Sequence, residues 1–368
     1  MARVAGPDLA LTGAAAEAVT DLVALTSELI AVPSVSGHER ALADHVQRAL
    51  EGVPGRLVRV DENVVHAAPR RHGRPLAVLA GHLDTVPAQG NEKPRVERGR
   101  LFGLGATDMK AGLAVMLELA RALAARESRF DLAFVFYECE EVAFEKNGLR
   151  KLWAELPWLA EAQLAIVLEP TDCAVELGCV GSLNVEFTAK GTAAHSARPW
   201  LGDNAVYKAL PLLERLAAME PVPVTIAGVT YQETLQVTLA RAGIGRNVVP
   251  DRFTVNVNRR YAPNRKPEDA IAEMRALVPP GDFELEVIDV SPPAPPNADC
   301  PLVAEFLGRF GLERRAKQGW TDVAQFTERG VPAFNFGPGV PELAHRADES
   351  LPVENLERAY RVLTEFLT

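Results

Sequence analysis

LAVLAGHLD, residues 76–84, is the stretch of the chain that decides its fold. The run is apolar as far as the glycine, and its polar residues, His82 and Asp84, come at the end. A continuous apolar run that ends in a turn is typical of a buried parallel strand, and open α/β sheets bind ligands at the carboxyl ends of such strands. The sequence therefore predicts an α/β sheet with a functional site at the end of this strand.

Two further apolar runs end in acidic turns. DLAFVFYEC, residues 131–139, leads into a pair of glutamates at 140–141, and LAIVLEP, residues 164–170, contains Glu169. Neighbouring parallel strands have their carboxyl ends at the same edge of a sheet, so we expect these carboxylates to lie close to the histidine of the first strand.

Two more candidates complete a set of six residues that can bind metal. Asp108 in GATDMKAG precedes a run with apolar residues at helical spacing, residues 109–125, and is expected at the N-terminus of that helix. His345 lies in ELAHRADE, near the other end of the chain. Taken singly, these residues also suit structural roles, such as a surface turn, a helix N-cap, a strand cap or a packed histidine.

The set as a whole predicts a metal centre. Four carboxylates and two imidazoles in a core need a cation to neutralise them. Oxygen-rich sites with two histidines suit zinc, with cobalt or manganese as alternatives, and this number of ligands suits two ions about 3.5–4 Å apart that share a carboxylate. Adjacent side chains diverge, so one of Glu140 and Glu141 can bind metal while the other acts as general base. Asp84 shares a strand face with His82 and can support its second ring nitrogen.

The pattern changes at about residue 180. SLNVEFTAKG, residues 182–191, alternates with period two, and a helix is predicted at about 203–219. Further alternating strands and helices follow as far as the proline-rich SPPAPPNADCP, residues 291–301. His345 comes after this linker. We therefore predict a catalytic domain at 1–179 and 293–368, with a two-layer α+β domain inserted at 180–292.

Composition excludes several classes of function. The 368 residues are 48% hydrophobic and 24% charged, as in soluble globular proteins, and the net charge of −10 argues against nucleic acid as a partner. No apolar run approaches a membrane span, and the first 22 residues lack the apolar core of a signal peptide. The four cysteines form no CxxC pair, which favours a reducing cytoplasm.

The motifs HLDTVP, GATDMKAG, CEE, LEPT and AHRADE, in this order, resemble the dinuclear zinc amidohydrolases of the aminoacylase/carboxypeptidase superfamily, over about residues 20–368. The resemblance implies a zinc-peptidase-like α/β/α catalytic domain with an inserted two-layer lid. It assigns one zinc to His82, Asp108 and Glu169. It assigns the other to Asp108, Glu141 and His345, with Asp108 as the bridge. Glu140 would be the general base, and Asp84 would orient His82.

The resemblance also gives roles to the inserted domain. It implies a homodimer through this lid, in which His195 of one subunit stabilises the oxyanion in the active site of the other. On the residues alone, His195 suits a loop position equally well. Asn247 and Arg260 would contact the substrate carboxylate, and Thr321 is a further substrate-binding candidate. The resemblance also implies a cis peptide between Asp108 and Met109.

ECEEV, GWTDVAQF and FGPGVPELAHRADE resemble the actinobacterial group of succinyl-diaminopimelate desuccinylases within this superfamily. That group hydrolyses N-succinyl-LL-2,6-diaminopimelate to succinate and LL-2,6-diaminopimelate. Proteobacterial relatives have Gly-Gly-Thr-Ser-Asp where this chain has Gly-Trp-Thr-Asp at 319–322, and many relatives have aspartate where this chain has Cys139. Other readings are a deacylase of other N-acyl amino acids, such as acetylornithine, a metallo-carboxypeptidase or dipeptidase, and an inert metal-binding scaffold.

Overall fold

The computed structural model describes residues 13–71, 73–124 and 126–368, and its contacts divide the chain into two compact units. The first unit comprises the described residues up to Val142, together with Asn147–Ala174 and Phe336–Thr368. The second comprises Ala143–Lys146 and Val175–Asn335, so it is inserted in the sequence of the first. Much of the segment searched for a signal peptide, residues 1–12, lies outside the described residues.

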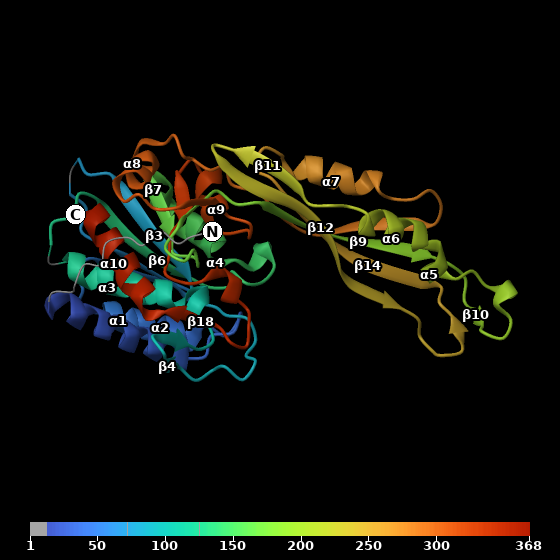
Figure 1. Cartoon of the computed structure of the whole chain (residues 1–368), viewed down its shortest axis with the longest axis horizontal. Coiled ribbons are helices and arrows are strands. Elements are labelled where there is room, and N and C mark those ends of the chain that lie inside the picture. The colour runs from blue at the N-terminus through green and yellow to red at the C-terminus, as the bar shows by residue number, and fades with distance from the viewer. Residues whose placement is uncertain (1–12, 72, 125) are drawn as a thin grey trace. The chain divides into compact units, whose positions relative to one another are not determined.

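A twisted sheet with strand order β1-β2-β6-β3-β7 forms the centre of the first unit (Figure 1). The neighbours β6, β3 and β7 are parallel, whereas β2 runs antiparallel to β6, and β1 to β2. Every residue of β3 and β6 is buried, as their largely apolar sequences predict. The bounds are β1 Arg56–Val60, β2 Asn63–Ala67, β3 Leu76–His82, β6 Asp131–Tyr137 and β7 Leu164–Val167.

Helices pack against this sheet. α3 lies against β3 and β6, the helices α1, α2 and α10 pack around α3, and α4 lies against β1 and β2 (Figure 1). α3 starts at Ala111, later than predicted, because Asp108 and Met109 have non-helical backbone angles in the preceding turn η1. The bounds are α1 Gly13–Ala31, α2 Arg40–Leu50, η1 Ala106–Lys110, α3 Ala111–Ala124, α4 Gly148–Glu155 and α10 Val353–Leu367.

Short elements complete the first unit. β4, β5 and β18 form a small antiparallel sheet in the order β18-β5-β4, which joins the C-terminal segment to the loop before η1. The bounds are β4 Arg95–Glu97, β5 Arg100–Phe102, η3 Pro157–Glu161, η5 Pro341–Leu343 and β18 Ser350–Pro352.

The second unit contains an antiparallel sheet with strand order β11-β12-β14-β9-β15. Helices α5, α6 and α7 cover one face of it, where alternate residues of β9, including Val185 and Phe187, form the core. The predicted two-layer α+β architecture is therefore present. The bounds are β9 Gly181–Lys190, α5 Ala205–Lys208, α6 Leu210–Ala217, β11 Val222–Ile226, β12 Val229–Ala242, β14 Arg252–Tyr261, α7 Pro267–Ala276 and β15 Phe283–Ser291.

The single helix predicted for 203–219 is instead two helices, α5 and α6, that meet at Ala209. Pro211 lies in the first turn of α6 and has no N–H to donate to the turn before it, which accounts for the break. Because β9 to β15 span residues 181–291, we keep 180–292 as the proposed boundaries of the lid.

The remaining strands of the second unit have the order β17-β8-β16, and β10 pairs with β13. Throughout the described ranges, no helix has both the length and the apolar character needed to cross a membrane. The bounds are η2 Phe144–Lys146, β8 Val175–Leu177, β10 Ala194–His195, η4 Pro199–Leu201, β13 Val248–Val249, α8 Pro301–Arg309, β16 Arg314–Ala316, α9 Val323–Glu328 and β17 Ala333–Asn335.

Candidate metal centre

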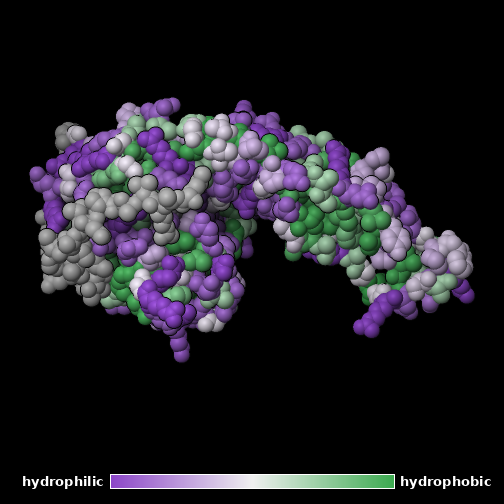
Figure 2. Space-filling model, viewed as in Figure 1, coloured by the Kyte–Doolittle hydropathy of each residue, from purple (hydrophilic) through white to green (hydrophobic). Residues whose placement is uncertain are grey.

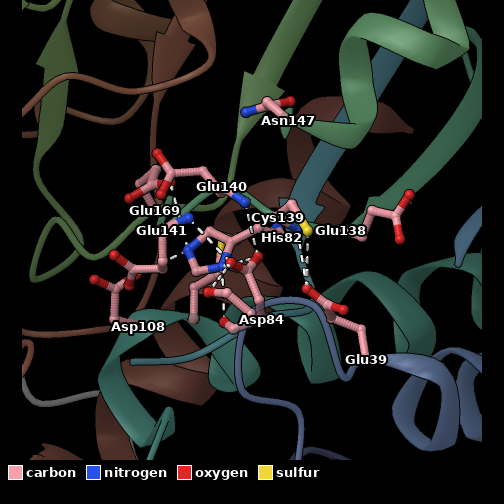
Figure 3. A network of polar contacts seen from close by, with 12 residues as sticks. Glu39, His82, Asp84, Asp108, Glu138, Cys139, Glu140, Glu141, Asn147 and Glu169 are labelled. Atoms are coloured by element: carbon pink, nitrogen blue, oxygen red, sulfur yellow. Dashed lines mark hydrogen bonds and ion pairs between the residues drawn. The ribbon is translucent and has the colours of Figure 1, made fainter. Parts of the chain in front are cut away.

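The carboxyl ends of β6, β3 and β7 bring the predicted residues together. His82 is the last residue of β3 and pairs with Tyr137 at the end of β6. The acidic turn 138–141 follows β6 directly, and Glu169 follows β7 by two residues. The side chains from these three strand ends converge, together with Asp108 from η1 (Figure 3). The parallel pairing of the three strands is the physical reason, as predicted.

One set of donor atoms lies at the buried end of this cluster. The Nε2 atom of His82 is 3.1 Å from Oδ1 of Asp108 and 3.9 Å from Oε1 of Glu169. The three residues offer ligand atoms that all lie within 4.8 Å of one another. His82 is only 1% exposed, so this set is enclosed by protein.

A second set shares the same aspartate. The Nε2 atom of His345 is 2.8 Å from Oε1 of Glu141 and 3.4 Å from Oδ2 of Asp108. Asp108 therefore presents one carboxylate oxygen to each histidine. Each set gathers three donor atoms within 4.8 Å and contains one imidazole, which fits a pair of divalent ions bridged by an aspartate.

The charges of the cluster favour cations strongly. Burial alone would lower the pKa of His82, but contacts with Asp108 and Asp84 raise it well above its usual value. Hydrogen bonds to Asp108 and Glu141 raise the pKa of His345 to about 10. Burial raises the pKa of Glu141. An imidazole must be neutral to bind a metal ion, so metal binding here would release the protons that the neighbouring carboxylates favour.

Asp84 has further partners besides the predicted one, His82. Its Oδ1 accepts the backbone N–H of Glu140 at 2.9 Å, and its Oδ2 accepts the backbone N–H of Glu141 at 3.0 Å and the hydroxyl of Ser36 at 2.7 Å. Nδ1 of His82 lies closer to the backbone oxygen of Asp84, at 3.0 Å, than to its carboxylate, at 3.5 Å. Asp84 thus holds the acidic turn as well as facing the histidine.

Sequence reasoning missed Glu349, which supports the turn that carries Asp108. Its carboxylate accepts the backbone N–H groups of Gly105, Thr107 and Asp108 at 2.9–3.0 Å, and the residue is 2% exposed. Burial raises the pKa of Glu349 to about 7. The peptide bond that follows Asp108 in this turn, to Met109, is cis, as predicted. The only sequence signal for Glu349 was its place in the AHRADE motif, four residues after the candidate histidine.

The other predicted residues lie in the second unit, so their relation to the metal cluster stays a prediction. His195 is exposed on β10, and its Nδ1 accepts the N–H of Ala197 at 3.0 Å. Asn247 lies beside it, because its backbone oxygen accepts the N–H of Ser196 at 2.9 Å. Arg260 lies on β14.

Thr321 is the most enclosed of these candidates. It is 2% exposed, and its hydroxyl donates to Oδ1 of Asn335 at 2.9 Å. The adjacent Trp320 donates from Nε1 to the backbone oxygen of Pro292 at 2.8 Å and packs edge-on against Phe144, with ring centroids 5.4 Å apart. Substrate binding by Thr321 therefore also stays a prediction.

Two sets of imidazole and carboxylate donors that share one aspartate, at the carboxyl edge of an α/β sheet, define a metal-dependent hydrolase. The family model described as peptidase family M20/M25/M40 matches residues 78–368, and the chain belongs to this family.

Particular relatives and a solved structure are also similar. The chain is 42% identical over 348 residues to a Mycobacterium tuberculosis protein named as a succinyl-diaminopimelate desuccinylase. The matched region covers 94% of this chain and 98% of the relative. It is also 42% identical to a Corynebacterium glutamicum succinyl-diaminopimelate desuccinylase, over 95% of this chain and 96% of that relative. The fold is similar to that of a Bacillus subtilis protein described as a dinuclear metal-binding M20 peptidase, with a TM-score of 0.69, 18% identity, and 95% and 97% of the two chains covered.

Proposed function

We propose that this protein is a metal-dependent amide hydrolase that converts N-succinyl-LL-2,6-diaminopimelate and water to succinate and LL-2,6-diaminopimelate, in lysine and diaminopimelate biosynthesis. The observation that carries the proposal is Asp108 between two donor sets, with Glu140 beside them. The 42% identity to two proteins named for this reaction, over nearly the whole chain, favours the succinyl substrate over N-acetylornithine or a peptide.

The cofactor of this proposal is a pair of divalent ions in each subunit, zinc first, with cobalt or manganese as alternatives. His82, Asp108 and Glu169 would hold one ion, and Asp108, Glu141 and His345 the other. When bound, the pair supplies a Lewis acid for the acyl carbonyl and lowers the pKa of the attacking water. The two histidines must be neutral to act as ligands, which couples binding to proton release.

Glu140 is proposed as the general base. Its carboxylate lies within 4.8 Å of donor atoms of His82 and Glu141, and its backbone N–H is held by Asp84. It takes a proton from the attacking water and returns this proton to the leaving amine, which departs neutral at that nitrogen. The carboxylate is thereby regenerated. Asp84 is included in the catalytic machinery because it holds both the base and the neighbouring ligand.

The lid is proposed to supply the remaining groups and a homodimer interface. β11 pairs only with residues 229–233 of β12, while β14 pairs with residues 234–242 from the other side. Val237 and Leu239 are 39% and 57% exposed in this second half. Among the described residues, no strand pairs with the side of residues 234–242 that faces away from β14. This free strand edge suits pairing with a second copy of the chain. Figure 2 shows hydrophobic surface on this unit.

In such a dimer, His195 would donate to the oxyanion in the site of the partner subunit. Asn247 and Arg260 would bind the substrate carboxylate, and the guanidinium of Arg260 is suited to this by its planar pair of donors. Thr321 is proposed as a further substrate-binding residue. We also propose a cytoplasmic location, since all four cysteines are free thiols, as suits a reducing compartment. Neither nucleic acid nor membrane is proposed as a partner, and the net charge of −10 is consistent with this for nucleic acid.

A hydrolysis screen tests the proposed function. The purified chain, loaded with zinc or cobalt, is assayed with N-succinyl-diaminopimelate, N-acetylornithine and dipeptides. We expect the succinyl substrate to have the highest kcat/KM, and a chelator to abolish turnover. A higher kcat/KM for N-acetylornithine or a dipeptide would assign the chain to that activity instead. Loss of turnover in Glu140→Gln with metal retained would exclude an inert scaffold.

A further inference from the structure

Two buried carboxylates, not one, hold the turn that carries Glu140 and Glu141. Asp84 accepts the backbone N–H groups of these two residues. The N–H group just before them, that of Cys139, donates to Oε1 of Glu39 at 3.2 Å. Three successive N–H groups of one turn are therefore held by acceptors from two distant segments of the chain (Figure 3).

Glu39 is buried and fixed in place by the turn before α2. It lies directly before α2, is only 1% exposed, and its Oε1 also accepts the N–H of Gly37 at 2.8 Å. The thiol of Cys139 is 3.4 Å from the same oxygen. Burial and then the charge of Glu39 raise the pKa of this thiol to about 12, so it stays protonated and can donate. One oxygen thus ties the turn before α2 to the turn after β6.

The backbone of Cys139 needs such support. Its φ angle is +59°, in the left-handed region that residues other than glycine seldom adopt. Conformations of this kind persist when the surroundings enforce them. A rotation of this peptide would redirect both side chains that follow it. The bond from Glu39 opposes that rotation from one side, and Asp84 opposes it from the other.

We propose that Glu39 is a positioning residue, which holds the peptide of Cys139 so that Glu140 faces the attacking water and Glu141 faces the metal ion. Its effect on turnover rests on the proposed function, in which Glu140 is the base. Its effect on Glu141 concerns metal affinity and does not depend on the substrate.

A metal site at Glu39 itself is the less favoured reading of the same atoms. Glu39, Glu138 and Cys139 offer donor atoms within 4.8 Å of one another. However, the carboxylate of Glu138 is already bound by the ammonium of Lys151 at 2.8 Å and by the amide of Asn63 at 3.2 Å. The oxygen of Glu39 is likewise occupied by N–H donors, so the network favours a holding role.

The test compares five full-length variants for kcat, KM, thermal stability and the dissociation constants of the two zinc ions. Glu39→Ala removes the acceptor, Glu39→Gln keeps an acceptor oxygen in place, and Glu39→Asp retracts the acceptor by one carbon. Cys139→Ala removes the thiol but keeps the N–H group. Glu138→Gln is the matched control, because it neutralises another buried carboxylate of the same turn that does not hold these N–H groups.

We expect Glu39→Ala to lower kcat and the affinity for one zinc ion by roughly 10–100-fold, the usual scale for groups that orient ligands, with KM changed about twofold at most. Glu39→Asp should show a smaller loss of the same kind. Glu39→Gln and Cys139→Ala should stay within about threefold of the wild type in both quantities, because the hydrogen bond to the backbone survives. Glu138→Gln should lower thermal stability alone.

Three results would overturn the inference. The first is wild-type kcat and zinc affinity in Glu39→Ala or, if that variant does not fold, in Glu39→Asp. The second is Glu39→Gln as impaired as Glu39→Ala, which would make the charge the important property. The third is an equal loss in Glu138→Gln. If the wild type leaves N-succinyl-diaminopimelate intact while Glu39→Ala still loses zinc affinity, the proposed substrate fails and the positioning role stands.

Discussion

Asp84→Asn should impair the enzyme through the acidic turn as well as through His82. The Asp84 carboxylate is fully buried and accepts three hydrogen bonds, from the N–H groups of Glu140 and Glu141 and from the hydroxyl of Ser36. Asparagine has one acceptor oxygen, and its NH₂ group would face a donor at the other position. A buried N–H that loses its acceptor costs about 1–3 kcal/mol.

That cost predicts the size of the effect. If the turn moves to relieve the donor–donor contact, Glu140 and Glu141 are displaced from their positions. We expect this displacement to raise the activation free energy by an amount comparable to that cost. Since 1.4 kcal/mol corresponds to about tenfold in rate, we expect kcat/KM to fall roughly 10–100-fold. Zinc affinity should fall at the site that contains Glu141, measured by competition with a chromophoric chelator. Ser36→Ala, which removes one of the three donors and creates no conflict, is the control and should lose about fivefold at most.

The outcome that refutes this reasoning is an Asp84→Asn protein with wild-type kcat/KM and zinc content. It would mean that the turn keeps its position without the second acceptor. An equal loss in Ser36→Ala would refute it too, because the hydroxyl rather than the two backbone N–H groups would then control the geometry.

Three further predictions follow from the site. Glu140→Gln should lower kcat at least about 10²-fold with both metal ions retained, whereas Glu141→Gln should lose metal at one site by elemental analysis; wild-type turnover in the former would remove Glu140 as the base. Mixing His195→Ala with Glu140→Gln subunits should restore activity, because one site of the mixed dimer has both groups; no recovery after verified exchange would exclude action across the dimer. Because the pKa of His345 is raised to about 10 without metal, binding must displace its proton. Zinc affinity at that site should therefore rise with pH below 10, by about tenfold per unit for one proton, and a pH-independent affinity between pH 6 and 8 would contradict this.

The amino-acid sequence by itself determined which residues could form the metal centre. The unbroken apolar runs that become β3, β6 and β7 signalled buried parallel strands, and the polar residue after each run marked its carboxyl end. Local patterns suffice here because strand burial and strand ends depend on neighbouring residues. The change to period-two alternation likewise located the two-layer unit at β9.

Tertiary structure alone decided how these residues are held. Asp84 stands two residues from His82, and this spacing suggested a role toward the imidazole, yet both its carboxylate oxygens are occupied by N–H groups more than 50 residues away in sequence. Glu39 reaches Cys139 across 100 residues, and Glu349 reaches Asp108 across 241. A carboxylate that accepts distant backbone N–H groups has no periodicity and no characteristic neighbours. Its partner is set by the packing of strands and helices, so its role becomes visible only when the chain is folded.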